Sequence, residues 1–171
     1  MDLKEKIRNI PDFPIKGVLF RDITTLIKDK DGYQELIDQL ADSLRDRRVD
    51  IVVGPEARGF VIGSALAYAL HAGFVLARKP GKLPCETIRY EYGLEYGADV
   101  LEIHKDAIQP GQNVVIVDDL LATGGTSLAT IRLVEQAGGN VVGVRFAIEL
   151  SSEFDGRAML KDYDVQSIMQ F

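Results

Sequence analysis

One stretch decides the fold: Val114-Val115-Ile116-Val117-Asp118-Asp119-Leu120-Leu121-Ala122-Thr123-Gly124-Gly125-Thr126. Its first four residues are β-branched, which is typical of a strand buried on both faces in a parallel sheet. Parallel α/β sheets bind ligands beyond the carboxyl ends of their strands. We therefore expect Asp118 and Asp119 to lie at the ligand-binding end of a central strand.

The turn after the acidic pair is suited to a phosphate. Gly124 and Gly125 let backbone N–H groups converge without Cβ clashes, and threonines before and after them add hydroxyl donors. A helix is expected to begin here, and the free N–H groups and dipole of a helix N-terminus favour an anion. Because carboxylates repel an anion, Asp118 and Asp119 are expected to face hydroxyl groups or a divalent cation. A ribose 5-phosphate meets both conditions.

Other readings of this stretch are weaker. No lysine follows Gly124-Gly125-Thr126 as in a Walker A loop, and no G-x-G-x-x-G sequence opens a helix. Glycine turns after buried strands are common, so a turn without a ligand is the alternative. Two adjacent acids at the end of a buried strand are costly to desolvate, however, which argues against a purely structural role for both.

Composition narrows the class of protein. The chain has 171 residues, 46% of them hydrophobic, which fits one domain. Its formal net charge of -6 is unfavourable for general nucleic-acid binding. The single cysteine, Cys85, excludes an internal disulfide, and no apolar run approaches the length of a membrane span. We expect a cytoplasmic protein whose partners are small molecules, with no nucleic acid and no membrane.

The rest of the chain alternates between strand and helix patterns. Helices are predicted over residues 33–44, 60–70 and 127–137, and strands over residues 50–53, 73–78, 114–118, 141–150 and 165–169. Residues 86–92 and 98–104 alternate as two antiparallel strands. Residues 9–23 are too irregular for the sheet and are expected to form a small separate cap. The fold class is therefore α/β, with a mainly parallel sheet flanked by helices.

Residues 117–126 resemble the phosphoribosyl-pyrophosphate (PRPP) motif of the type I phosphoribosyltransferases, and most of all that of the adenine phosphoribosyltransferases. Further segments match the same family in order, and the similarity runs from about Asn9 to the end of the chain. The segments are Pro11-Asp12-Phe13-Pro14 with Gly17-Val18-Leu19-Phe20-Arg21-Asp22-Ile23, Gly54-Pro55-Glu56-Ala57-Arg58-Gly59-Phe60, Arg78-Lys79-Pro80-Gly81-Lys82-Leu83-Pro84, and Leu94-Glu95-Tyr96-Gly97 with Leu101-Glu102-Ile103-His104-Lys105-Asp106. The resemblance implies a type I phosphoribosyltransferase fold in a single domain, 1–171, with a hood over about 9–23 and a flexible flap over about 84–104.

The resemblance also implies a reaction. Adenine and PRPP would give AMP and pyrophosphate in purine salvage, with Mg2+ arriving on PRPP rather than being held directly by side chains, in a homodimer. Relatives that use 6-oxopurines carry an aspartate where Ala122 stands, which argues against those bases. The alternative is a regulator that binds PRPP or a purine without catalysis. Such regulators tend to lose the flap base, whereas Glu95 is retained here.

Site residues follow from the resemblance position by position. Glu95 and Arg58 are expected to be catalytic, and Tyr96 to close with the flap. The ribose hydroxyls are expected to bind to Asp118 and Asp119. The 5-phosphate is expected to bind to Ala122, Thr123, Gly124, Gly125 and Thr126. Pyrophosphate is expected to bind to Arg58, Arg78, Lys79 and Lys82. Adenine is expected to bind to Leu19, Phe20, Arg21 and Leu120.

Two departures from the family pattern concern the pyrophosphate side. The family carries a non-proline cis peptide that would fall at Glu56-Ala57, where many relatives have Asp-Ser, so one hydroxyl donor is lost. Pro80 stands where some relatives have a basic residue, which leaves Lys82 as the better phosphate ligand. For the adenine side, simple packing of the N-terminal segment is the alternative role of Leu19 and Phe20, although an apolar slot suits a flat base.

Overall fold

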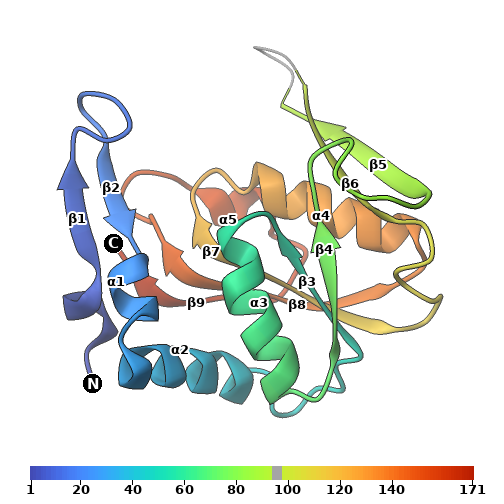
Figure 1. The fold of residues 1–171 in the computed structure, drawn as a ribbon, viewed down its shortest axis with the longest axis horizontal. Helices are drawn as coiled ribbons and strands as arrows, with labels where there is room; N and C mark the ends of the chain where they lie inside the picture. Colours follow the sequence, from blue (N-terminus) through green and yellow to red (C-terminus); the bar gives the residue numbers. More distant parts are fainter. Residues whose placement is uncertain (94–97) are drawn as a thin grey trace.

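The computed structural model of the chain describes residues 1–93 and 98–171 (Figure 1). Its centre is a five-stranded parallel sheet in the order β4-β3-β7-β8-β9. The strands are β3 (Ile51–Pro55), β4 (Gly73–Ala77), β7 (Asn113–Leu121), β8 (Asn140–Glu149) and β9 (Val165–Gln170). The α/β architecture predicted from the sequence is confirmed.

Helices cover both faces of the sheet. The longer ones are α2 (Lys30–Asp42), α3 (Arg58–Ala69) and α4 (Gly125–Gln136). Short helical turns are η1 (Leu3–Lys6), α1 (Thr24–Ile27) and α5 (Gly156–Met159). Buried side chains of α2 and α3 pack with one face of the sheet, and those of α4 pack with the other, so the protein has two hydrophobic cores. Among the described residues, no helix has the length and apolar character needed to cross a membrane.

Strand β7 divides the two cores. Val115 and Val117 belong to the core with α2 and α3, whereas Val114 and Ile116 belong to the core with α4. All four side chains have 0% exposed surface. Successive side chains of a strand point to opposite faces, so a run of β-branched residues fits a strand that is covered on both sides.

The strand is longer than the sequence predicted. Its pairing with β3 ends at Ile116, but its pairing with β8 continues to Leu121, opposite Glu149. Asp118 and Asp119 therefore lie inside β7 rather than at its end. They follow the last residue paired with β3, where the sheet is open on one side.

Two antiparallel strand pairs stand apart from the central sheet. The hood consists of β1 (Arg8–Pro11) and β2 (Leu19–Asp22), and the flap consists of β5 (Thr87–Tyr92) and β6 (Asp99–His104). Figure 1 shows them rising on opposite sides of the molecule. Backbone hydrogen bonds between Arg78 and Glu102 join the end of β4 to the flap. The predicted separation of the hood and the antiparallel pairing of the flap are confirmed.

Candidate active site

The phosphate turn, residues 122–126, connects β7 to α4. Together with neighbouring residues of β7 and α4 it lines a cavity of about 160 Å³. Gly124 has φ +90°, a conformation that favours glycine, and it is the N-cap residue of α4. Gly124 has no side chain to cap the helix, and the Gly125 N–H makes only a long contact, 3.5 Å, with Thr123 Oγ1. Within the described residues no side chain accepts from the next N–H groups of α4, so they can bind an anion.

The two acids beside the turn have different surroundings. Asp119 is mostly buried and accepts a hydrogen bond from Arg58 Nε at 2.5 Å. Asp118 lines the cavity, and its Oδ1 accepts the Asp119 N–H at 2.8 Å. Desolvation, and then the charge of Asp119, raise the pKa of Asp118 well above its usual range. In this structure Asp118 is thus the acid that faces the cavity, and Asp119 holds an arginine.

A second candidate anion-binding loop, residues 54–59, lies against this pair. It follows β3 and contains the cis Glu56-Ala57 peptide expected from the resemblance. A Cβ on Gly59 would stand 3.0 Å from Asp118 Oδ1, so the loop backbone packs closely on the acidic pair. Arg58 begins α3 and has a side chain 54% exposed, with its pKa raised by the Asp119 charge. The two loops therefore form adjoining halves of one site.

Glu56 organises the basic segment after β4. Its Oε1 accepts hydrogen bonds from Arg78 Nε at 3.2 Å and from the Lys79 N–H at 2.8 Å. Desolvation acts to raise the pKa of Glu56, but these hydrogen bonds and the Arg78 charge outweigh it and the pKa is lowered. Lys79 and Lys82 are exposed. The structure thus places Arg58 within the 54–59 loop and bonds Arg78 to Glu56 of the same loop, while the two lysines are exposed to solvent.

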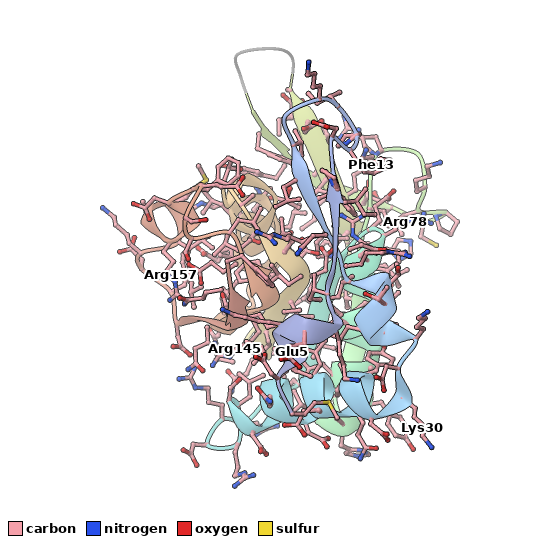
Figure 2. The ribbon with its side chains drawn as sticks, turned by 90° about the vertical axis from the view of Figure 1, so that its left-hand side faces the viewer. Glu5, Phe13, Lys30, Arg78, Arg145 and Arg157 are labelled. Carbon is pink, nitrogen blue, oxygen red and sulfur yellow. The ribbon has the colours of Figure 1, made fainter. Side chains whose placement is uncertain are left out.

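The hood approaches the site through Phe20, whose ring centroid lies 6.0 Å from the Arg58 guanidinium. Figure 2 shows Phe13 of the hood and Arg78 at the same end of the molecule. Leu19 is 39% exposed, and Leu120 lines the cavity. The Arg21 guanidinium lies 4.4 Å from the Phe171 ring centroid. The binding of adenine between Leu19 and Leu120 stays a prediction.

Sequence reasoning missed one residue of the flap. The Tyr92 hydroxyl lies 3.4 Å from Thr126 Oγ1, and the Tyr92 ring lies 3.5 Å from the place where a Cβ on Gly125 would stand. The alternating pattern of β5 places Tyr90 and Tyr92 on one face, which is the only signal the sequence carried. The predicted flap residues Glu95 and Tyr96 lie outside the described residues.

A larger open hollow, of about 710 Å³, lies at the root of the flap. Of the site residues that the sequence predicts and the structure describes, none lines this hollow. Its lining residues are Cys85, Glu86, Ile88, Lys105, Asp106, Ile108, Gln109, Pro110, Gln136 and Ala137. The smaller cavity combines a helix N-terminus with one acid, Asp118, and the hydrogen-bonded pair of Asp119 and Arg58 lies next to that acid. It is therefore the better candidate for a sugar phosphate.

Comparisons with known proteins identify relatives of this chain. Residues 24–155 match the phosphoribosyl transferase domain family. An adenine phosphoribosyltransferase of Clostridium perfringens is 60% identical over 171 residues, covering 100% of this chain and 99% of the relative. The crystal structure of the adenine phosphoribosyltransferase from Thermoanaerobacter pseudethanolicus superposes with a TM-score of 0.95 at 55% identity, over 99% of this chain and 98% of that one. The adenine phosphoribosyltransferase from Saccharomyces cerevisiae, in complex with an imino-altritol bisphosphate and adenine, superposes with a TM-score of 0.91 at 41% identity. The superposition covers 98% of this chain and 96% of that one.

Proposed function

Because the chain belongs to the adenine phosphoribosyltransferases of the phosphoribosyl transferase family, we propose that it makes AMP and pyrophosphate from adenine and PRPP in purine salvage, with Mg2+. The observation that carries the proposal is the junction of the phosphate turn with the acidic pair and Arg58. A phosphorylated sugar needs anion donors at one end and hydroxyl acceptors at the other, and the site offers both. The yeast relative's complex with a bisphosphate and adenine supports the same pairing of ligands.

The proposed reaction is a displacement at the anomeric carbon of PRPP. A nitrogen of adenine forms a bond to that carbon as the bond to pyrophosphate oxygen breaks, and the electron pair leaves with pyrophosphate. Arg58 and Arg78, with Lys79 and Lys82, would stabilise the departing negative charge. Arg58 is suited to this because only its Nε is hydrogen-bonded to a described residue, so its terminal nitrogens are available.

The ribose and the base place further demands on the site. Positive charge develops on the ribose as pyrophosphate departs, and the carboxylate of Asp119 would offset it. The same positive charge would lower the raised pKa of Asp118 and favour its ionised form, so that both acids accept from the ribose hydroxyls. Glu95 is proposed, from the resemblance alone, to accept a proton or hydrogen bond from the purine, and Tyr96 to close with it. Closure of the flap would also exclude water that hydrolyses PRPP.

The donor set fits a Mg2+ ion that binds largely through its substrate. Within residues 1–93 and 98–171 there is no group of three or more His, Cys, Asp or Glu side chains that could hold a metal. Mg2+ commonly combines one or two carboxylates with substrate phosphates and waters, and Asp118 and Asp119 supply such carboxylates. When bound, the ion would neutralise charge on the pyrophosphate. EDTA should abolish turnover and excess Mg2+ should restore it, whereas turnover in EDTA would contradict this role.

Base selectivity tests the proposed function directly. Ala122 has no carboxylate to address N7 of a 6-oxopurine, so adenine should be used far better than hypoxanthine, guanine or xanthine. The measurement is pyrophosphate release from PRPP with each base in parallel. Comparable turnover of hypoxanthine would contradict the assignment. Binding of PRPP or adenine without turnover would instead favour the non-catalytic regulator.

We also propose a homodimer that forms through the α3–β4 face, defined by Val61, Ser64, Tyr68 and Leu76. The three α3 residues recur at helical spacing and are exposed, with Tyr68 at 90%. Strand β4 is an edge strand of the central sheet, and its Leu76 is 41% exposed. An exposed edge strand beside exposed apolar side chains is typical of a surface that binds another protein. A second copy of this chain would bury both.

A cytoplasmic location is likewise proposed. Cys85 is exposed and free, which suits a reducing compartment.

A further inference from the structure

Two glycines from distant parts of the chain pack on each other at the phosphate turn. A Cβ on Gly124 would stand 2.8 Å from the Gly156 carbonyl oxygen, and a Cβ on Gly156 would stand 2.4 Å from the Ala122 carbonyl oxygen. Neither distance is tolerated by a side chain, so the backbone of α5 lies directly against the backbone of the turn. The conformation of the turn therefore depends on where α5 is held.

An arginine next to Gly156 holds α5 in place. Arg157 donates from Nε and from its NH2 group to the two carboxylate oxygens of Glu149, both at 2.8 Å. Its remaining terminal nitrogen donates to the Val165 carbonyl oxygen at 2.9 Å. A bidentate arginine–carboxylate pair fixes direction as well as distance. Arg157 thus ties α5 to β8 and β9 at once, on the side of the molecule formed by the last elements of the chain (Figure 2).

Glu149 stands where it can transmit that constraint. It is the β8 partner of Leu121, the residue that immediately precedes the phosphate turn. Its side chain is only 7% exposed, and Gln170 Nε2 lies 3.4 Å from its Oε2. The hydrogen bonds from Arg157 lower the pKa of Glu149, so the carboxylate stays charged and keeps the arginine. One ion pair, Arg157–Glu149, therefore constrains both Leu121 at the end of β7 and the backbone of α5.

We propose that Arg157 and Glu149 are positioning residues that set the geometry of the phosphate turn, with the packing of Gly124 on Gly156 as the contact through which they act. This inference rests on the proposed function, since the phosphate is that of PRPP or AMP. Anion binding by converging N–H groups depends on their directions, and a small displacement of such groups is costly. Neither residue lines the cavity at the turn, so their loss should weaken phosphate binding without removing a catalytic group.

The test compares Arg157→Ala with a matched control, Arg47→Ala. Arg47 also bonds a carboxylate, that of Asp164, and a backbone carbonyl, that of Val142, but at the other end of β8. For Arg157→Ala we expect the KM for PRPP and the Kd for AMP to rise about 10-fold, while the Kd for adenine alone changes less than about 2-fold. Arg157→Lys should recover part of the loss, because lysine keeps a charge but not the bidentate fork. Arg47→Ala should lower the melting temperature and leave both phosphate-dependent constants unchanged.

A second variant, Gly156→Ala, acts on the contact itself and keeps the ion pair. Its added methyl would collide with the Ala122 carbonyl, so the same selective rise for PRPP and AMP is expected. If Arg157→Ala does not fold, the KM for PRPP and the Kd for AMP of Gly156→Ala test the proposal on their own. A normal KM for PRPP in Gly156→Ala, or equal effects of Arg157→Ala on AMP and adenine binding, would overturn the proposal. A wild-type protein that neither binds nor uses PRPP would instead overturn the proposed function.

Discussion

At the scale of single residues, the acidic pair shows how neighbours in sequence acquire different tasks. Successive residues of a strand point to opposite sides, and accordingly Asp118 lines the cavity whereas Asp119 bonds Arg58. The Arg58–Asp119 pair keeps the arginine at the site before any anion is bound. Binding of pyrophosphate then adds partners to a guanidinium that is already in place, which reduces the ordering needed at that moment.

Glu95 is the residue whose proposed role is most easily separated from binding. Glu95→Gln keeps the size of the side chain and one acceptor oxygen, but it cannot take a proton. We expect kcat to fall by about 10²- to 10⁴-fold while PRPP and AMP still bind. Steady-state kinetics and AMP titration check this. An effect on KM alone would make Glu95 a positioning residue, and unchanged kinetics would mean that the purine needs no side-chain base.

Sequence reasoning predicted which residues gather at the site better than it predicted their contacts. The glycine turn and the acids were identifiable because their residue types have few other uses at the end of a buried strand. The Glu56–Arg78 and Arg58–Asp119 pairs join residues far apart in the chain, so no local pattern could indicate them. Glu56 is the clearer example. The sequence indicated only that the Glu56-Ala57 pair lacks the hydroxyl of a serine at Ala57, whereas the Glu56 carboxylate holds Arg78 and the Lys79 backbone.

At the scale of elements, the flap strand β5 contributes to the phosphate turn. Tyr92→Ala removes the ring beside Gly125 and the hydroxyl near Thr126, and we expect the KM for PRPP to rise about 5-fold with the KM for adenine unchanged. Tyr92→Phe should lose little, because the hydroxyl contact is long. Tyr90→Ala, on the same face of the strand, is the control. A rise of equal size in Tyr90→Ala would mean that general packing of the flap is responsible.

The extent of β7 was the main error at this scale. The pattern of four β-branched residues indicated a strand that ends at Asp118, but the ladder with β8 continues through Leu121. Backbone pairing with a neighbour of similar length extends a strand beyond its hydrophobic run, and that neighbour is not adjacent in sequence. The same extension brings Glu149 opposite Leu121, which explains why no local pattern indicated the Arg157–Glu149 pair.

At the scale of the whole molecule, the hood and the flap project from the central sheet with its covering helices (Figure 1). Periodicity predicted every strand of that sheet to within a few residues, because burial on both faces leaves a strong apolar signal. It could not predict how the two small antiparallel pairs lie relative to the turn. Their positions depend on contacts such as Phe20 with Arg58 and Tyr92 with Thr126, which only the folded chain reveals.

The proposed homodimer can be tested by placing charges on the α3–β4 face. Tyr68→Glu combined with Leu76→Lys puts charge on the α3–β4 face and should convert the dimer to an 18.9 kDa monomer. Light scattering at micromolar concentration measures this. Phe154→Glu, which changes an exposed aromatic side chain away from that face, should leave the dimer intact. A wild-type monomer that retains full activity would contradict the proposed homodimer.

If the acidic pair and the phosphate turn together form the PRPP site, the kinetics of a variant without the two acids should show it. The variant Asp118→Asn with Asp119→Asn is nearly isosteric, and circular dichroism can confirm that its fold is retained. Each amide loses the charge that strengthens a hydrogen bond from a ribose hydroxyl and that offsets positive charge on the ribose. We predict that kcat/KM for PRPP falls about 100-fold or more relative to wild type. A folded double variant with wild-type kcat/KM would contradict the account, because the acids would then be structural.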